Sequence, residues 1–100
     1  MERAHVLAKY LAKAIEYDCD ELLFENRNGR EYIFFHKNGR GFGMVSLKSA
    51  SDEADRMRQE LGHMTRQALT LRHREQDYLL KAKEYESANE PAFHVVIKAC

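Results

Sequence analysis

Two Asn-Gly dipeptides, at positions 28–29 and 38–39, constrain the fold of this chain more than any other feature. Both residues of such a dipeptide tolerate the positive φ angles that a tight two-residue hairpin turn requires. The segment between the two turns, 31–36, is rich in β-branched and aromatic residues, which suit a strand. We therefore predict a three-stranded antiparallel meander of segments 21–26, 31–36 and 42–47, with the 31–36 strand in the middle.

Apolar residues at helical spacing predict a helix on each side of this meander. The first helix spans about residues 2–17, and its apolar face consists of Leu7, Tyr10, Leu11, Ala14 and Ile15. The second begins after several candidate N-cap oxygens in the segment 49–52 and runs to about Arg66. Its predicted buried stripe consists of Ala54, Met57, Leu61 and Met64.

The last third of the chain predicts two or three further strands. Residues 68–72 suit either a strand or an extension of the second helix. In the segment 76–85, Tyr78, Leu80 and Ala82 alternate with Lys81 and Lys83. Segment 87–91 predicts a turn because Pro91 cannot donate to a ladder, and Phe93, Val95 and Ile97 form the inward side of the last strand. The prediction is an α+β fold with an antiparallel sheet of five or six strands and two helices, in the order α-β-β-β-α-β-β(-β).

Length and charge narrow the class of protein. One hundred residues predict a single domain, 1–100, and 16 basic residues balance 16 acidic ones. A net charge of zero gives no bulk attraction to nucleic acid or to an anionic membrane. No apolar run approaches the roughly 20 residues of a membrane span. Cys19 and Cys100 predict free thiols in a reducing compartment, so we expect a cytoplasmic protein.

The residue types that carry chemistry do not form recognisable motifs. Five histidines are scattered without helical pairs, and neither cysteine has a second cysteine two residues away. His36 and His94 are strand residues that could meet across a sheet. Nothing in the pattern positions a thiol beside a histidine. We predict no catalytic residue, no metal site, no cofactor and no enzymatic activity.

The stretch from Arg40 to Leu47 has the pattern basic–Gly–aromatic–Gly–bulky–Val followed by two strand positions. It resembles the RNA-contacting octapeptide of RNA-recognition-motif domains. The resemblance implies binding of single-stranded RNA through Arg40, Phe42 and Met44 on one strand face. That family, however, places a strand before its first helix and beside the octapeptide strand. This chain begins with a helix, so RNA binding is the alternative prediction.

The front half also resembles the N-terminal, non-catalytic domains of type II secretion and pilus ATPases. The residues concerned are Ala14-Ile15-Glu16 with Cys19 to Glu25, and Tyr32-Ile33-Phe34 with Lys37-Asn38-Gly39. No Gly-x-x-x-x-Gly-Lys-Ser/Thr loop occurs in the chain. The resemblance therefore implies a stand-alone regulatory or docking domain.

Both faces of the predicted middle strand are apolar, with Tyr32, Phe34 and His36 opposite Ile33 and Phe35. Each face needs cover, either from two helices or from one helix and a partner chain. An uncovered aromatic face or an open strand edge favours binding to protein or self-association. We therefore predict a small cytosolic, non-catalytic interaction or regulatory domain that binds an unknown protein partner or a second copy of itself.

Overall fold

The computed structural model describes residues 5–100, apart from the side chains of His5 and Phe42. Its elements are α1 (His5–Glu16), β1 (Glu21–Arg27), β2 (Arg30–Lys37), β3 (Arg40–Lys48), α2 (Asp52–Arg66), β4 (Leu69–His73), β5 (Gln76–Ser87) and β6 (Glu90–Ala99). This order confirms the predicted α+β fold, and residues 69–72 of the undecided segment 68–72 belong to strand β4. The predicted start of the first helix, residues 2–4, lies outside the described residues.

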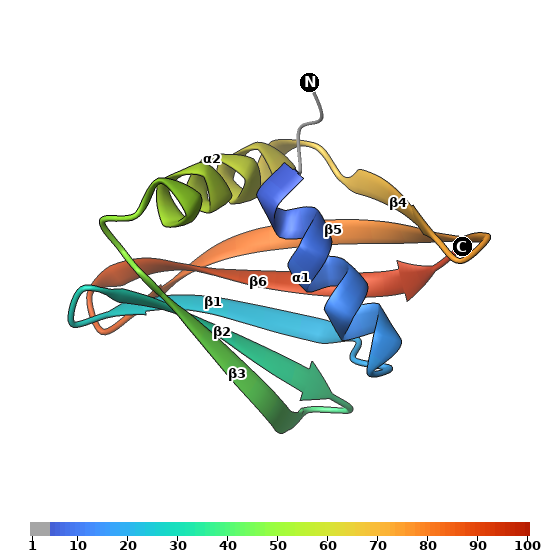
Figure 1. Cartoon of the computed structure of the whole chain (residues 1–100), viewed down its shortest axis with the longest axis horizontal. Helices are drawn as coiled ribbons and strands as arrows, with labels where there is room; N and C mark the ends of the chain where they lie inside the picture. Colours follow the sequence, from blue (N-terminus) through green and yellow to red (C-terminus); the bar gives the residue numbers. More distant parts are fainter. Residues whose placement is uncertain (1–4) are drawn as a thin grey trace.

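All six strands form one antiparallel sheet with the order β3-β2-β1-β6-β5-β4 (Figure 1). Strand β2 pairs with both β1 and β3, which confirms the predicted meander. The residues of both Asn-Gly turns have positive φ, as the turn type requires. The last strand, β6, pairs with the first, β1, along Phe93 to Val96. This pairing joins the N-terminal meander to the C-terminal strands in one sheet.

Two further hairpins are tighter than the sequence indicated. The turns at Arg74-Glu75 and Ala88-Asn89 each have two residues with positive φ, without the Asn-Gly signature. The turn predicted at 87–91 is therefore shorter, and Pro91 lies within β6 opposite Glu86. Pro91 lies beyond the part of β6 that pairs with β1. At this position β6 has no strand on its β1 side, so the missing N–H of Pro91 is tolerated. A proline between two paired strands would break a ladder hydrogen bond.

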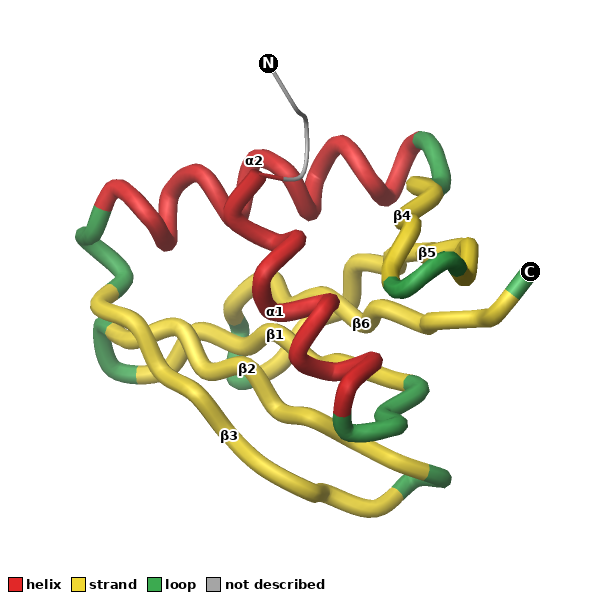
Figure 2. Tube along the Cα trace, turned by 45° about the vertical axis from the view of Figure 1, so that its right-hand side comes forward, coloured by secondary structure: helices red, strands yellow, loops and turns green. Residues whose placement is uncertain are grey.

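Both helices pack on the same face of the sheet (Figure 2). The core between them and the sheet buries the predicted helix stripes together with the inward side of the strands. Its fully buried large side chains are Leu7, Leu11, Leu22, Ile33, Met57, Leu61, Leu80 and Val95. The two helices thus cover the face of β2 that carries Ile33 and Phe35. Neither helix of the described residues lies on the opposite face of the sheet.

The second helix holds the first one in place. Its own start is capped by Ser51, whose hydroxyl accepts a hydrogen bond from the backbone N–H of Ala54 at 3.1 Å. Helix α1 has no acidic residue in its first turn. Instead the buried carboxylate of Glu60, on α2, accepts from the backbone N–H groups of Val6 and Leu7 at 3.1 and 2.8 Å. A side chain 53 residues away in sequence therefore satisfies the N-terminal turn of α1.

Candidate functional site

The sheet face turned away from both helices has no other described element packed over it, and we call it the open face. Cross-strand register divides it into two halves. The apolar half lies on β1, β2 and β3 and contains Leu23, Tyr32, Phe34 and Met44. The rings of Tyr32 and Phe34 stack with centroids 6.1 Å apart. The basic half lies on β5 and β6 and contains Lys81, Lys83 and Lys98.

Charge is distributed unevenly over this molecule of zero net charge. By register the strand positions of the open face include seven basic residues, Arg27, Arg30, Lys48, Arg72, Lys81, Lys83 and Lys98. They include four acidic residues, Glu21, Glu25, Asp77 and Glu90. Asp77 is neutralised by Arg72 at 3.0 Å, and Glu21 contacts Nε2 of His94 at 2.8 Å. The open face is therefore basic, which the net charge of the chain conceals.

A buried carboxylate lies between the two halves. Glu25 is 9% exposed and accepts a hydrogen bond of 2.6 Å from the hydroxyl of Tyr85, and it also pairs with Arg27. Burial by itself would raise the pKa of the Glu25 carboxyl. The hydrogen bonds from Tyr85 and Arg27 stabilise the carboxylate by more, so the net effect is a lowered pKa. Burial and the adjacent carboxylate together raise the pKa of Tyr85. These groups hold β1 to β5 across β6 and are fully partnered, which suits a structural role.

An apolar hollow of about 340 Å³ lies at the free edge of the sheet, where the end of α1 meets β3. We call it the edge hollow; it is lined by Lys13, Tyr17, Phe35, Gly43, Met44 and Val45. Tyr17 and Met44 are the two large hydrophobic side chains that the described part of the chain exposes, at 50% and 57%. Both therefore line the same hollow. An exposed apolar cluster beside an open strand edge is typical of a protein-binding surface.

Two glycines, Gly41 and Gly43, leave part of strand β3 without side chains at the edge of the sheet. A Cβ atom added at Gly41 or Gly43 would meet nothing within 4 Å, and neither residue has a positive φ. Neither turn geometry nor close packing within the described chain requires glycine at these two strand positions. Glycine weakens a strand interior and often marks close approach of another backbone. The space beside β3 therefore suits an approaching chain.

The structure changes the geometry expected for the RNA-binding alternative. Strand β3 has an irregular register between Phe35 and His36, which lie opposite Gly43 and Gly41 and leave residue 42 unpaired. Arg40 lies opposite Lys37, and Met44 lies opposite Phe34, which places them on opposite faces of the sheet. The prediction that Arg40, Phe42 and Met44 share one face is therefore wrong for Arg40 and Met44, because the extra residue breaks the alternation. The side chain of Phe42 lies outside the described part of the structure.

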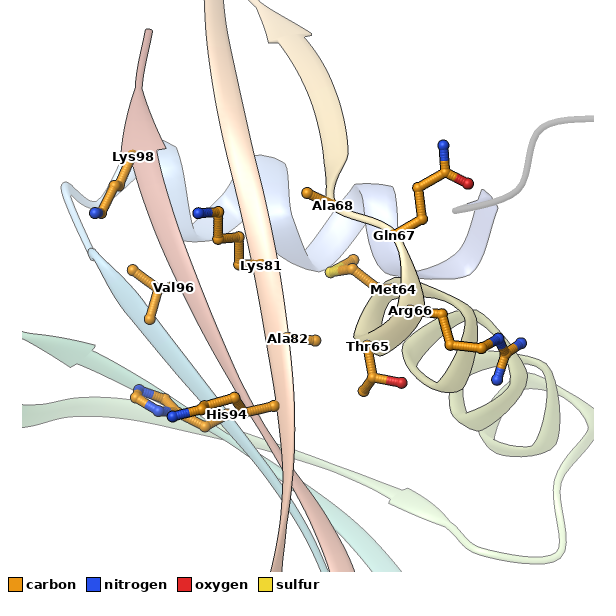
Figure 3. Close-up of a pocket in the computed structure, with 11 residues that line it drawn as sticks. Met64, Thr65, Arg66, Gln67, Ala68, Lys81, Ala82, His94, Val96 and Lys98 are labelled. Carbon is orange, nitrogen blue, oxygen red and sulfur yellow. The ribbon is translucent and has the colours of Figure 1, made fainter.

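A second hollow, of about 420 Å³, borders β5 near the opposite edge of the sheet. We call it the lysine hollow. Its walls come from the end of α2 and from β5 and β6, and its residues include Lys81, Lys83, Lys98, His94, Val96 and Arg66. Figure 3 shows Lys81, Val96, His94 and Lys98 on one side of β5, with Thr65 and Arg66 on the other. Among residues 5–100, no acidic residue lines it.

Metal and thiol chemistry find little support among residues 5–100. No group of three His, Cys, Asp or Glu residues in this range could hold a metal ion. His36 and His94 are both neighbours of Glu21, His36 as its cross-strand partner and His94 through a hydrogen bond. Cys19 is a buried free thiol whose pKa is raised, mainly by burial and then by Asp20. Cys100 is free and exposed.

None of the helices that the structure describes has the length and apolar character needed to cross a bilayer. Comparison of the chain with family models, with curated proteins and with solved structures gives no match. The resemblances to RNA-recognition motifs and to secretion ATPase N-terminal domains therefore remain predictions.

Sequence reasoning missed both hollows. The edge hollow combines Tyr17, beyond the end of α1, with residues of β3, and only the tertiary fold brings them together. The available signal was the pair Gly41 and Gly43 beside an apolar strand. The lysine hollow had a clearer signal, because Lys81 and Lys83 alternate with buried residues of β5.

Proposed function

We propose that this chain is a non-catalytic, protein-binding domain that accepts an extended segment of its partner along β3. The observation that carries the proposal is the edge hollow, because the two exposed large hydrophobic residues of the described chain, Tyr17 and Met44, both line it beside the outer edge of β3. Backbone hydrogen bonds to an edge strand supply affinity, and a pocket beside the edge selects side chains. In this arrangement the partner segment places one apolar side chain in the edge hollow.

The charges around β3 specify the chemistry of the partner. Arg40 and Lys48 stand at the two ends of the strand, and Lys13 lines the hollow. Within the described residues these three have no acidic partner. The matching segment is therefore apolar in its middle and acidic at its flanks. An antiparallel pairing of two β3 strands centred on Met44 would oppose Arg40 to Lys48, so a different protein fits this edge better than a second copy.

The absence of a recognisable catalytic arrangement in the sequence supports a binding role over an enzymatic one. The two cysteines are both free thiols, which supports the expectation of a reducing, cytoplasmic environment.

Selection of peptides from a random displayed library tests the proposal without knowledge of the natural partner. We expect enriched peptides with an apolar centre and acidic flanks. Their binding should protect backbone amides of β3 from hydrogen exchange, and Met44→Asp should weaken it at least tenfold. Met44 is 57% exposed, so this substitution should change the free energy of unfolding by no more than about 0.5 kcal/mol.

Ala99→Asp is the matched control, because Ala99 is an exposed strand residue on β6, outside the edge hollow. It introduces the same charge and should leave peptide binding unchanged. If no peptide is enriched, or if enriched peptides bind the Met44→Asp variant as tightly as the unsubstituted protein, docking on β3 is refuted.

A further inference from the structure

The lysine hollow supports a second binding activity, at a surface separate from the edge hollow. Register places Lys81 opposite Val96 and Lys83 opposite His94, while Lys98 lies two residues along β6 from Val96. Lys81 and Lys83 therefore flank Val96 and His94 on the β5 side, and Lys98 lies beyond Val96 along β6, so that Val96 and His94 form a floor beside three lysines. All three lysines are exposed, and both floor residues are half-buried.

The lysines have no counter-charge within the described part of the chain. None of Lys81, Lys83 and Lys98 forms an ion pair with a carboxylate there. The nearest acid on the same cross-strand row is Glu21, opposite Val96, and it is engaged by His94. In a chain with equal numbers of acids and bases, three neighbouring lysines without a carboxylate form a local anion-binding surface.

The shape of the surface selects among anions. Lysine is a compact point charge on a flexible stem and lacks the planar fork that holds a single carboxylate or phosphate in two bonds. The three lysines lie on the open face, so they do not enclose a small anion. Lys81 and Lys83 are two residues apart on one strand face, which separates their attachment points by about 6.6 Å. This arrangement suits a chain of successive phosphates better than an isolated one.

The floor offers a contact surface for the base of a nucleotide, as the lysines do for its phosphate. Aromatic side chains, including histidine, stack on unpaired bases, and an apolar side chain can pack against a base face. His94 and Val96 offer such a surface beside the cationic groups. The combination of phosphate contacts around a base platform is the mode in which proteins bind single-stranded nucleic acid without sequence preference.

We propose that the lysine hollow binds phosphate-bearing nucleosides, presented as a single-stranded nucleic acid whose backbone runs past Lys81, Lys83 and Lys98. The bases lie over Val96 and His94. The site is on β5 and β6, so it does not use Arg40, Phe42 or Met44. It is also independent of the proposed docking along β3.

Fluorescence anisotropy with a labelled single-stranded RNA of mixed sequence, titrated over a range of salt concentrations, tests this site. Three phosphate contacts predict a slope of about −2 in log K against log salt, or roughly a twentyfold loss of affinity between about 50 and 200 mM salt. The triple variant Lys81→Gln, Lys83→Gln, Lys98→Gln should lose most of the binding and most of this slope. All three side chains are exposed, so the variant should fold normally.

The control variant Lys13→Gln, Lys37→Gln, Arg40→Gln removes three charges from exposed positions outside the lysine hollow. It should retain the RNA binding, and the Lys81, Lys83, Lys98 variant should retain the peptide binding that depends on Met44. Equal losses in the two triple variants would show bulk electrostatics or a role of Arg40, and would overturn the assignment. So would the absence of any salt-dependent binding to the unsubstituted protein.

Competitors define the ligand. Unlabelled RNA should displace the probe at low concentration, ATP only at much higher concentration, and inorganic phosphate more weakly still. If ATP competes as well as RNA on a nucleotide basis, the site binds free nucleotides and the strand assignment fails. If polyglutamate competes as well as RNA, the hollow is an acidic-peptide site, and the nucleotide assignment fails.

Discussion

The carboxylate of Glu60 joins the two helices, and its removal should destabilise the fold by an amount that the geometry allows us to estimate. Glu60 is 8% exposed and accepts hydrogen bonds from the N–H groups of Val6 and Leu7 at 2.8 to 3.1 Å. Hydrogen bonds to a charged group contribute about 1.5–3 kcal/mol each. The negative charge near the start of α1 adds a further 0.3–1 kcal/mol or so through the helix dipole.

We do not expect a variant to lose the sum of these hydrogen-bond and dipole energies. The first turn of α1 can fray, and water can then satisfy its N–H groups. Glu60→Gln retains one acceptor oxygen but loses the charge, and we expect it to lower the free energy of unfolding by about 1–2 kcal/mol. Glu60→Ala should cost about 3 kcal/mol. For a domain of this size the glutamine variant corresponds to a decrease in Tm of roughly 5–15 °C.

Urea unfolding gives the global effect, and hydrogen exchange of the Val6 and Leu7 amides gives the local one. Both amides should exchange faster in Glu60→Gln than in the unsubstituted protein. The control is Glu53→Gln on the same helix. Glu53 pairs with exposed Lys9, so this substitution should cost less than about 0.5 kcal/mol. A Glu60→Gln variant as stable as Glu53→Gln, with unchanged exchange at Leu7, would refute the proposed link between the helices.

Further substitutions probe other parts of the structure. Tyr85→Phe removes the 2.6 Å hydrogen bond to buried Glu25 and should lower the free energy of unfolding by about 1–2 kcal/mol in urea titrations. The pKa of Glu25 is lowered in the fold, so its contribution is present above the unfolded-state pKa of about 4.3 and is lost as pH falls through the folded-state pKa. The stability advantage of the unsubstituted protein over Glu25→Gln should therefore shrink on acidification, and a constant difference would contradict the shift. Gly43→Thr should raise the stability of the free domain by about 0.5 kcal/mol, since a Cβ meets open space there. The same substitution should weaken peptide binding along β3. Unchanged peptide binding would argue against docking at that edge. Leu61→Ala, at a 1% exposed core position, should cost about 2–5 kcal/mol by thermal or urea unfolding.

The local elements of the fold could be predicted because their signals are local. The Asn-Gly turns, the β-rich segment between them and the helical spacing of Leu7, Leu11 and Ala14 each act over a few residues. Cross-strand pairing of β1, β2 and β3 follows from the two turns alone. The hairpins at 74–75 and 88–89 could not be assigned as precisely, since their positive φ angles fall on Arg74, Glu75, Ala88 and Asn89, residues that do not specify this turn type.

The candidate site depended on distant segments, and the sequence predicted it only in part. The apolar alternation of residues 32–36 predicted that both faces of β2 need cover, and the structure places both helices on the face of Ile33 and Phe35. The position of Arg40 relative to Met44 could not be inferred, because a single extra residue in β3 reverses the side on which Arg40 lies. The zero net charge predicted only that there is no bulk attraction to nucleic acid or membrane, and the strand register is needed to see that basic residues collect on the open face.

The amino-acid sequence alone determined the fold class, the meander and the faces of the two helices, because turn chemistry and hydrophobic period act between neighbouring residues. Only the tertiary structure decided that β6 closes against β1, that Glu60 completes the start of α1, and that both helices choose the same face of the sheet. These outcomes depend on contacts between residues far apart in the chain, which no local pattern encodes. The two hollows follow from them, since each lies where an element from one part of the chain meets strands from another.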